Sequence, residues 1–289
     1  MTANLVYYHH PDDDQFSLYF VNPDREAIDG RLESYDERTE TRVRSYDLDE
    51  VVYVIYAKTN EVDDTEKIEY DFDVAFAEMD PDTRVIVREI LEVFTGIQEE
   101  KQDEEGVPLD AYKNIELERF PAALDHVDWV KTVPETGGQL ASNLVLCHAL
   151  PNANHRTAFG ILEAYLKAVD SSFELPSMVT DDYEWQAWVD EYIVDSKRLL
   201  TVRRNVGPFG YLAEYGCGTV RQKGGIDVPL AEYDLEMHRR EAFVEYANQH
   251  VQRTTTFVET ILRETNSEGL LEASSLRKET FAECLRRLD

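Results

Sequence analysis

The residues with the clearest potential for chemistry lie together between His148 and Phe159, in the stretch HALPNANHRTAF. Apolar segments with helical periodicity flank this stretch, and Pro151 disfavours continuation of the first helix. Asn154 is a favoured N-cap residue, so we expect the second helix to begin there, with unpaired backbone N–H groups and a positive dipole end. The pattern therefore predicts two helices joined by a short bend that carries several polar side chains.

Arg156 falls in the first turn of the predicted second helix, where the helix dipole disfavours a cation. The placement becomes favourable if an anion binds there, because arginine and helix amides together bind phosphate. His148, on the other side of the bend, would then accept a proton from an incoming hydroxyl group. A structural alternative stays open, because an isolated histidine beside a capped helix is more often a packing residue than a base.

This bend resembles the signature of the Fic/Doc (Fido) family, His-x-Phe-x-(Asp/Glu)-(Gly/Ala)-Asn-x-Arg, which joins two helices. The matching residues are His148, Leu150, Ala153, Asn154 and Arg156. Alanine before the asparagine and the continuation Arg-Thr-Ala are closer to the Doc branch than to the Fic branch. The resemblance covers roughly residues 80–200 and leaves both ends of the chain outside it.

The resemblance implies transfer of part of ATP to a hydroxyl side chain of a target protein. The AMP moiety moves in Fic-type members and the terminal phosphate moves in Doc-type members. By the same resemblance His148 is the general base, Asn154 and Arg156 hold phosphate oxygens, and loop amides stabilise developing charge. The His155 side chain either contacts phosphate when protonated or points to solvent. The resemblance also implies ATP and Mg²⁺ as cofactors. Family analogy adds a protein target or an antitoxin-like partner, as for a toxin of a toxin–antitoxin or defence system.

Three positions depart from the family pattern. Asn152 stands where the acidic magnesium ligand normally lies, and a neutral amide is a weaker ligand for a hard cation. His155 replaces the lysine of the Doc branch and the glycine of the Fic branch. Phe159 replaces the second arginine of the Fic branch, which argues against ordinary AMP transfer. These changes motivate an alternative function, a catalytically silent Fido scaffold that binds a protein or a nucleotide without turnover.

Other candidate sites are weaker. Cys147 adjoins His148, but neighbouring helical residues point about 100° apart and do not face each other. His148 and His155 have no obvious third partner for a metal site. Residues 207–225 are rich in glycine yet complete neither a GxGxxG motif nor a P-loop, so we expect a hairpin or a flexible connection.

The composition bounds the environment and the partners. The chain has 29 Lys and Arg against 59 Asp and Glu, a formal net charge of −30, with the acidic residues spread throughout. A localised acidic block would indicate a basic partner or a nucleic-acid mimic, whereas a diffuse excess is typical of a salt-rich cytoplasm that screens the repulsion. The sequence contains no basic stripe, so direct binding to nucleic-acid phosphates is disfavoured. No long apolar run or leader-like N-terminus is visible, so we expect a soluble cytoplasmic protein without membrane contact.

The elements around the bend predict an α+β protein. Residues 1–79 are expected to form an antiparallel β-rich module. In this module NLVYY and FSLYFV flank a turn, Val51–Ala57 is a buried strand, and Ile68–Phe76 alternates between apolar and acidic residues like a half-buried strand. A module of this kind could recognise a target, pair with a partner or cover the core.

The remaining chain is predicted to be mainly α-helical. Residues 80–205 are expected to form a Fido-like helical core that begins at an Asp80 cap followed by Pro81, with the first helix stopping near Gly96. Residues 206–289 are expected to contain the glycine-rich connection and C-terminal packing helices.

Overall fold

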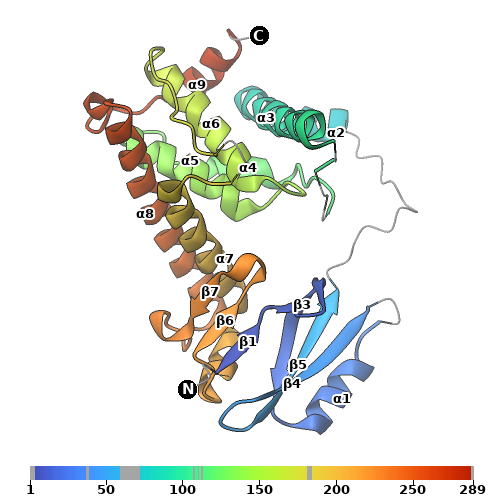
Figure 1. The fold of residues 1–289 in the computed structure, drawn as a ribbon. Coiled ribbons are helices and arrows are strands. Elements are labelled where there is room, and N and C mark those ends of the chain that lie inside the picture. Colours follow the sequence, from blue (N-terminus) through green and yellow to red (C-terminus); the bar gives the residue numbers. More distant parts are fainter. Residues whose placement is uncertain are drawn as a thin grey trace. The chain divides into compact units, whose positions relative to one another are not determined.

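The computed structural model describes residues 4–36, 39–58, 72–106, 108–109, 111, 113–180 and 184–287. It is an α+β fold, which confirms the predicted fold class (Figure 1). The chain forms two compact units: unit 1 comprises Met1–Asp63 and Val194–Asn248, and unit 2 comprises Asp64–Ile193 and Gln249–Asp289. Each unit combines two stretches that are distant in sequence, so this grouping differs from the three consecutive segments that the sequence suggests.

A four-stranded antiparallel sheet with the order β2-β3-β5-β4 dominates unit 1. Its strands are β2 (His9–His10), β3 (Asp13–Asn22), β4 (Thr41–Asp47) and β5 (Val51–Lys58). The strand predicted at Val51–Ala57 is confirmed by β5. The hairpin predicted at the N-terminus is confirmed only in part, because β2 rather than the preceding strand pairs with β3.

A second, three-stranded sheet uses the first strand of the chain. β1 (Leu5–Tyr7) pairs in parallel with β6 (Thr219–Arg221), which pairs antiparallel with β7 (Asp227–Pro229). The predicted hairpin is therefore observed only at the end of the glycine-rich stretch, and the prediction is wrong for residues 207–214, which continue the helix α7 (Ala187–Glu214). Arg221 and Asp227 form a two-point ion pair across it, with N–O distances of 2.6 and 2.8 Å.

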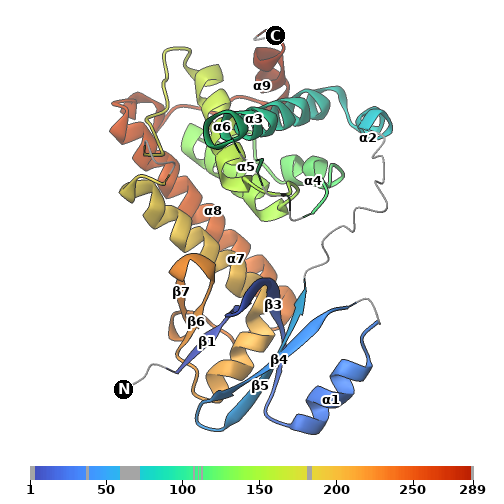
Figure 2. The same ribbon diagram turned by 45° about the vertical axis from the view of Figure 1, so that its right-hand side comes forward.

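The core of unit 1 lies between the four-stranded sheet and α7 (Ala187–Glu214). Val52, Val54 and Tyr56 of β5 are fully buried on one face, as expected for alternate residues of a strand. Val202 and Val206 of α7, one helical turn apart, belong to the same apolar cluster. The helix α1 (Arg25–Glu33) packs against β3 and β5 (Figure 2).

The strand predicted at Ile68–Phe76 is wrong over its second half. Phe72–Glu78 forms a helix, α2, whereas Ile68 and Tyr70 lie outside the described residues. Alternation predicts a strand only where a neighbouring strand covers one face, and in α2 Val74 is 55% exposed. The alanines and the glutamate in this stretch favour a helix.

The helix α3 (Pro81–Glu105) begins as predicted, with Asp80 as its N-cap. The Asp80 carboxylate accepts hydrogen bonds from the N–H groups of Asp82 and Thr83 at 3.1 and 2.9 Å. Burial raises the pKa of Asp80, but the hydrogen bonds from Thr83 and the Lys278 ammonium outweigh that effect and lower this pKa to about 2.

The predicted stop of this helix near Gly96 is wrong, because α3 continues to a left-handed cap at Gly106. Gly96 lies inside the helix on an open surface, where a glycine costs about 1 kcal/mol relative to alanine without ending the helix.

Unit 2 is a group of packed helices around α6. They include α4 (Arg119–Asp125), α5 (Val133–Cys147), α6 (Asn154–Val169) and α9 (Lys278–Leu285), and α8 (Arg239–Glu264) contributes its second part. α6 packs against α3, α5 and α9 (Figures 1 and 2). No helix in the described part of the chain combines the length and apolar character that a membrane span requires.

Glycine allows α5 to approach α8 closely. A Cβ atom placed on Gly138 of α5 would lie only 2.7 Å from the Cα of Thr255 in α8. Backbone atoms cannot move aside as a flexible side chain can, so this position requires glycine.

Candidate functional site

The bend between α5 and α6 is built as the sequence predicts. α5 starts with a capping box, in which the N–H and hydroxyl groups of Thr132 donate to the Glu135 carboxylate at 3.1 and 2.8 Å. The helix ends at Cys147, and His148 is its C-cap residue. The following loop of residues 149–153 leads directly into α6, so the predicted helix–loop–helix is confirmed.

Two residues at the ends of this loop have the left-handed backbone conformation. His148 has a φ of 48° and Ala153 a φ of 53°, and among the described residues only Asn266 is a further non-glycine residue with positive φ. This conformation costs an L-residue with a Cβ atom roughly 1–2 kcal/mol. Such strain persists only where the surroundings impose it, and it concentrates at functional sites.

Lys113 holds the first of these strained residues. Its ammonium group donates to the backbone carbonyl of His148 and also contacts the Glu116 carboxylate. The last carbonyls of a helix have no partner within the helix, and a cation is favoured at that end. Lys113 therefore fixes the backbone of His148 while the histidine ring stays half-buried.

Two neighbouring residues complete this clamp. Arg119 donates to the carbonyl of Cys147 at 3.1 Å and forms an ion pair with Glu116 at 2.8 Å. The N–H of Glu116 donates to the carbonyl of Ala149 at 2.9 Å. Sequence reasoning missed this clamp. Its only local signal is the spacing of Lys113, Glu116 and Arg119 at three-residue intervals, which does not indicate a distant partner.

Asn154 closes the loop instead of capping α6, so its prediction as the N-cap is wrong. Ala153 is the N-cap residue and Asn154 is the first residue of the helix. The Asn154 side chain turns back, donating to the Leu150 carbonyl at 3.1 Å and accepting from the Leu150 N–H at 3.3 Å. The Asn154 side-chain amide, to which the Fic/Doc resemblance assigns phosphate binding, therefore also braces the loop.

The first turn of α6 carries His155 and Arg156, both half-buried. The Arg156 guanidinium carbon lies 5.5 Å from the centroid of the Trp185 ring, a distance at which a cation is attracted by an aromatic face. Ala153 has no side-chain acceptor for the helix amides, unlike the aspartate that caps α3. The start of α6 thus combines a helix dipole, an oriented arginine and no capping carboxylate.

The structure therefore brings the predicted site residues to one bend of the backbone. His148 ends α5, Asn152 lies in the loop, and Asn154, His155 and Arg156 open α6. Burial raises the pKa of the neighbouring Cys147 thiol to about 11, which disfavours a thiolate nucleophile near neutral pH.

The residues present do not fit a magnesium ion held by protein carboxylates. Asn152 is neutral, and its side-chain oxygen accepts a hydrogen bond from the N–H of Ala153 at 2.7 Å. Within the described ranges, no group of three or more His, Cys, Asp and Glu side chains is placed to hold a metal ion.

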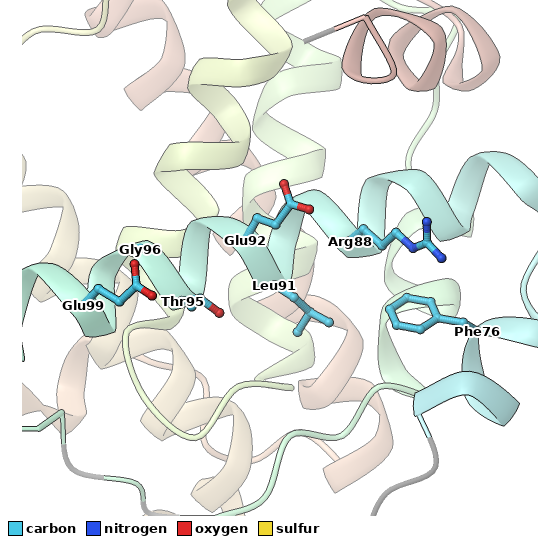
Figure 3. A pocket seen from close by; sticks show the side chains of 7 residues that line it. All are labelled: Phe76, Arg88, Leu91, Glu92, Thr95, Gly96 and Glu99. Carbon is cyan, nitrogen blue, oxygen red and sulfur yellow. The ribbon is translucent and has the colours of Figure 1, made fainter. Parts of the chain in front are cut away.

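A depression of about 580 Å³ lies elsewhere in unit 2, along α2 and α3 (Figure 3). It is lined by Phe76, Arg88, Leu91, Glu92, Thr95, Gly96 and Glu99. The Arg88 guanidinium lies over the Phe76 ring at one end, at 5.5 Å from the centroid. None of the predicted site residues lines this depression, so its size does not identify the chemical site.

Comparison with known proteins places the chain in a family without assigning an activity. The model described as Family of unknown function (DUF8172) matches residues 2–289, and the chain belongs to this family. No curated protein and no solved structure matches the chain.

Proposed function

We propose that this protein is a Fic/Doc-like transferase that moves AMP or phosphate from ATP to a hydroxyl side chain of a target protein. The observation that carries the proposal is the geometry of the α5–α6 bend. His148 is held in a strained conformation at the end of α5, and Arg156 stands in the first turn of α6. The Fic/Doc signature has the same histidine and arginine on two helices joined by a loop.

His148 acts as the general base in this proposal. It removes the proton from the target hydroxyl as the hydroxyl oxygen forms a bond to phosphorus. Attack at the α-phosphorus breaks the bond to pyrophosphate and leaves AMP on the target. Attack at the γ-phosphorus releases ADP and leaves a phosphate on the target. The strained backbone clamped by Lys113 supports a fixed position for the base.

Arg156 binds phosphate oxygens and stabilises the charge that develops on them. Its contact with Trp185 restricts the guanidinium before the substrate arrives, which reduces the entropy lost on binding. Amides at the start of α6 add donors of fixed orientation. In the Fic/Doc family this asparagine holds phosphate. Here the Asn154 side chain is hydrogen-bonded to Leu150 and keeps the loop in the shape that presents these groups.

The composition supports a cytoplasmic setting for this transferase. The diffuse charge of −30 favours a salt-rich cytoplasm, where counter-ions screen repulsion. Family analogy adds a target protein or an antitoxin-like partner.

A second candidate function is a silent scaffold that binds nucleotide or protein without turnover. Asn152 favours it, because a neutral amide replaces the acidic magnesium ligand and its oxygen is already hydrogen-bonded within the loop. Asn152→Asp separates the candidates, since a weakened metal site predicts that this variant gains transfer activity. If Asn152→Asp leaves activity unchanged, the lost carboxylate is not the cause.

Labelled ATP tests the transferase. The purified chain is incubated in high salt with magnesium and a lysate of its own cells, with ATP labelled at the α- or the γ-phosphate. Protein-bound α label establishes AMP transfer and γ label alone establishes phosphate transfer, provided that His148→Ala abolishes the label. His126→Ala, at the exposed end of α4, is the matched control. No label with either substrate contradicts the transferase.

A further inference from the structure

A basic and aromatic surface lies at the start of α8, in unit 1. Arg239, Arg240 and Phe243 line a depression of about 290 Å³ there. Residues three and four positions apart on a helix are neighbours on one face, so both arginines stand beside the ring. Phe243 is 47% exposed and Val244 is 58% exposed, which is unusual for apolar side chains of this size.

Arg203 of α7 supports the Phe243 ring from within the protein. Its guanidinium carbon lies 3.4 Å from the ring centroid, and its Nε donates to the Phe243 carbonyl at 2.9 Å. Arg203 is only 8% exposed and does not line the depression. One face of the ring is therefore covered by a cation, and the exposed part of the ring faces the depression.

The arginines of this surface are not engaged in ion pairs within the part of the chain that the structure describes. Among the residues that the structure describes, no carboxylate forms an ion pair with Arg203, Arg239 or Arg240. Burial lowers the pKa of Arg203 to about 10, and the neighbouring Arg204 lowers it further. This is unexpected in a chain with 59 acidic and 29 basic residues, where a carboxylate is available near most cations. A bound anion would give Arg239 and Arg240 the charged partner that they lack among the described residues.

We propose that this surface is a nucleotide-binding site, in which Arg239 and Arg240 bind the phosphate and the base stacks on Phe243. Arginine suits phosphate because its planar fork donates two parallel hydrogen bonds. A base stacks on an aromatic ring through its π-face, and the ring here is fixed by Arg203 before the ligand arrives. The ligand class follows from this combination of a phosphate-binding pair and a single ring platform.

The dimensions and the charge favour a free nucleotide over a longer strand or a protein. The depression is small, about 290 Å³ with three lining residues, whereas single strands follow a basic groove over several nucleotides. A net charge of −30 without a basic stripe opposes such a groove. The site lies in unit 1 and the α5–α6 bend lies in unit 2, so this inference does not rest on the proposed transferase.

Titration calorimetry of the full chain tests the site, with AMP as the probe and Arg156→Gln as the background that disables the other proposed phosphate site. We expect AMP to bind in this background. Phe243→Leu is expected to weaken AMP binding by roughly 5- to 150-fold, the range for loss of one base–aromatic stack, while weak binding of inorganic phosphate stays unchanged. Arg239→Gln combined with Arg240→Gln is expected to weaken both ligands.

The controls separate the site from bulk charge and from misfolding. Arg277→Gln combined with Arg287→Gln removes the same charge from exposed positions in unit 2 and should leave AMP binding unchanged. Circular dichroism confirms that each variant is folded. The inference is overturned if AMP does not bind in the Arg156→Gln background, or if the Phe243 variant binds AMP as the background does. Tighter binding of a short oligoadenylate than of AMP would overturn the choice of a free nucleotide.

Discussion

Replacing Ala153 by glycine should stabilise the protein, although most substitutions destabilise. Ala153 has a φ of 53°, where its Cβ atom costs roughly 1–2 kcal/mol that glycine does not incur. Glycine is also a better N-cap residue than alanine. The added freedom of glycine in the unfolded chain offsets about 0.4–1 kcal/mol of this gain. The expected net effect is a stabilisation of about 1 kcal/mol.

Urea unfolding followed by tryptophan fluorescence measures this effect. All three tryptophans, Trp129, Trp185 and Trp188, lie in unit 2, which contains the bend. With an m-value of about 1–3 kcal/mol/M, a gain of about 1 kcal/mol raises the urea midpoint by about 0.3–1 M.

Ala158→Gly is the matched control for this prediction. Ala158 is buried in the interior of α6, where the change to glycine should lower the midpoint, because glycine costs about 1 kcal/mol in a helix. A lower midpoint for Ala153→Gly as well would refute the reasoning that the surroundings hold this loop in a strained conformation.

Three further predictions concern the framework around the bend. Gly138→Ala should destabilise the protein by about 1–3 kcal/mol in the same urea assay, because the added Cβ would meet the Thr255 backbone. Gly96→Ala, on the open face of α3, should instead stabilise the protein. Equal effects of the two substitutions would contradict the close approach of α5 to α8. Lys113→Met should reduce label transfer as well as the free energy of unfolding. Undiminished transfer would show that the clamp does not position the base. Asp80→Asn should be less stable than the wild type at neutral pH. Because the pKa of Asp80 falls from 3.8 to about 2 on folding, this difference should shrink as the pH falls through that window, and a constant difference from pH 7 to 2 would contradict it.

Local signals in the sequence were sufficient to predict the bend. Helical periodicity on both sides, Pro151 between them and polar residues after it identified α5, the loop and α6. The same kind of signal located the start of α3, because an aspartate followed by proline is a local start signal. In each case the information lies within a few residues of the boundary.

One error and two omissions arose where distant residues decide the structure. Alternation in Ile68–Phe76 predicted a strand, but no local pattern tells whether a neighbouring strand will cover it. The parallel pairing of β1 with β6 joins the N-terminus to residues 219–221, which no local pattern indicates. The clamp on His148 by Lys113 is also a long-range contact.

The strain at the bend could not be read from the sequence either. Positive φ is uncommon for any non-glycine residue, although histidine adopts it more often than alanine does, so the types of His148 and Ala153 predict an ordinary loop. In the structure this conformation occurs together with the Lys113 clamp and the Asn154 brace. Sequence reasoning therefore located the candidate site and could not show how it is held.

The most direct test of the central claim is to titrate ATP while following the backbone amide signals of His155 and Arg156 by nuclear magnetic resonance. Binding of phosphate at the start of α6 predicts that these amide signals shift as ATP is added, and that Arg156→Gln removes the shift. If ATP leaves these signals unchanged in the wild-type protein, the bend is not a phosphate site.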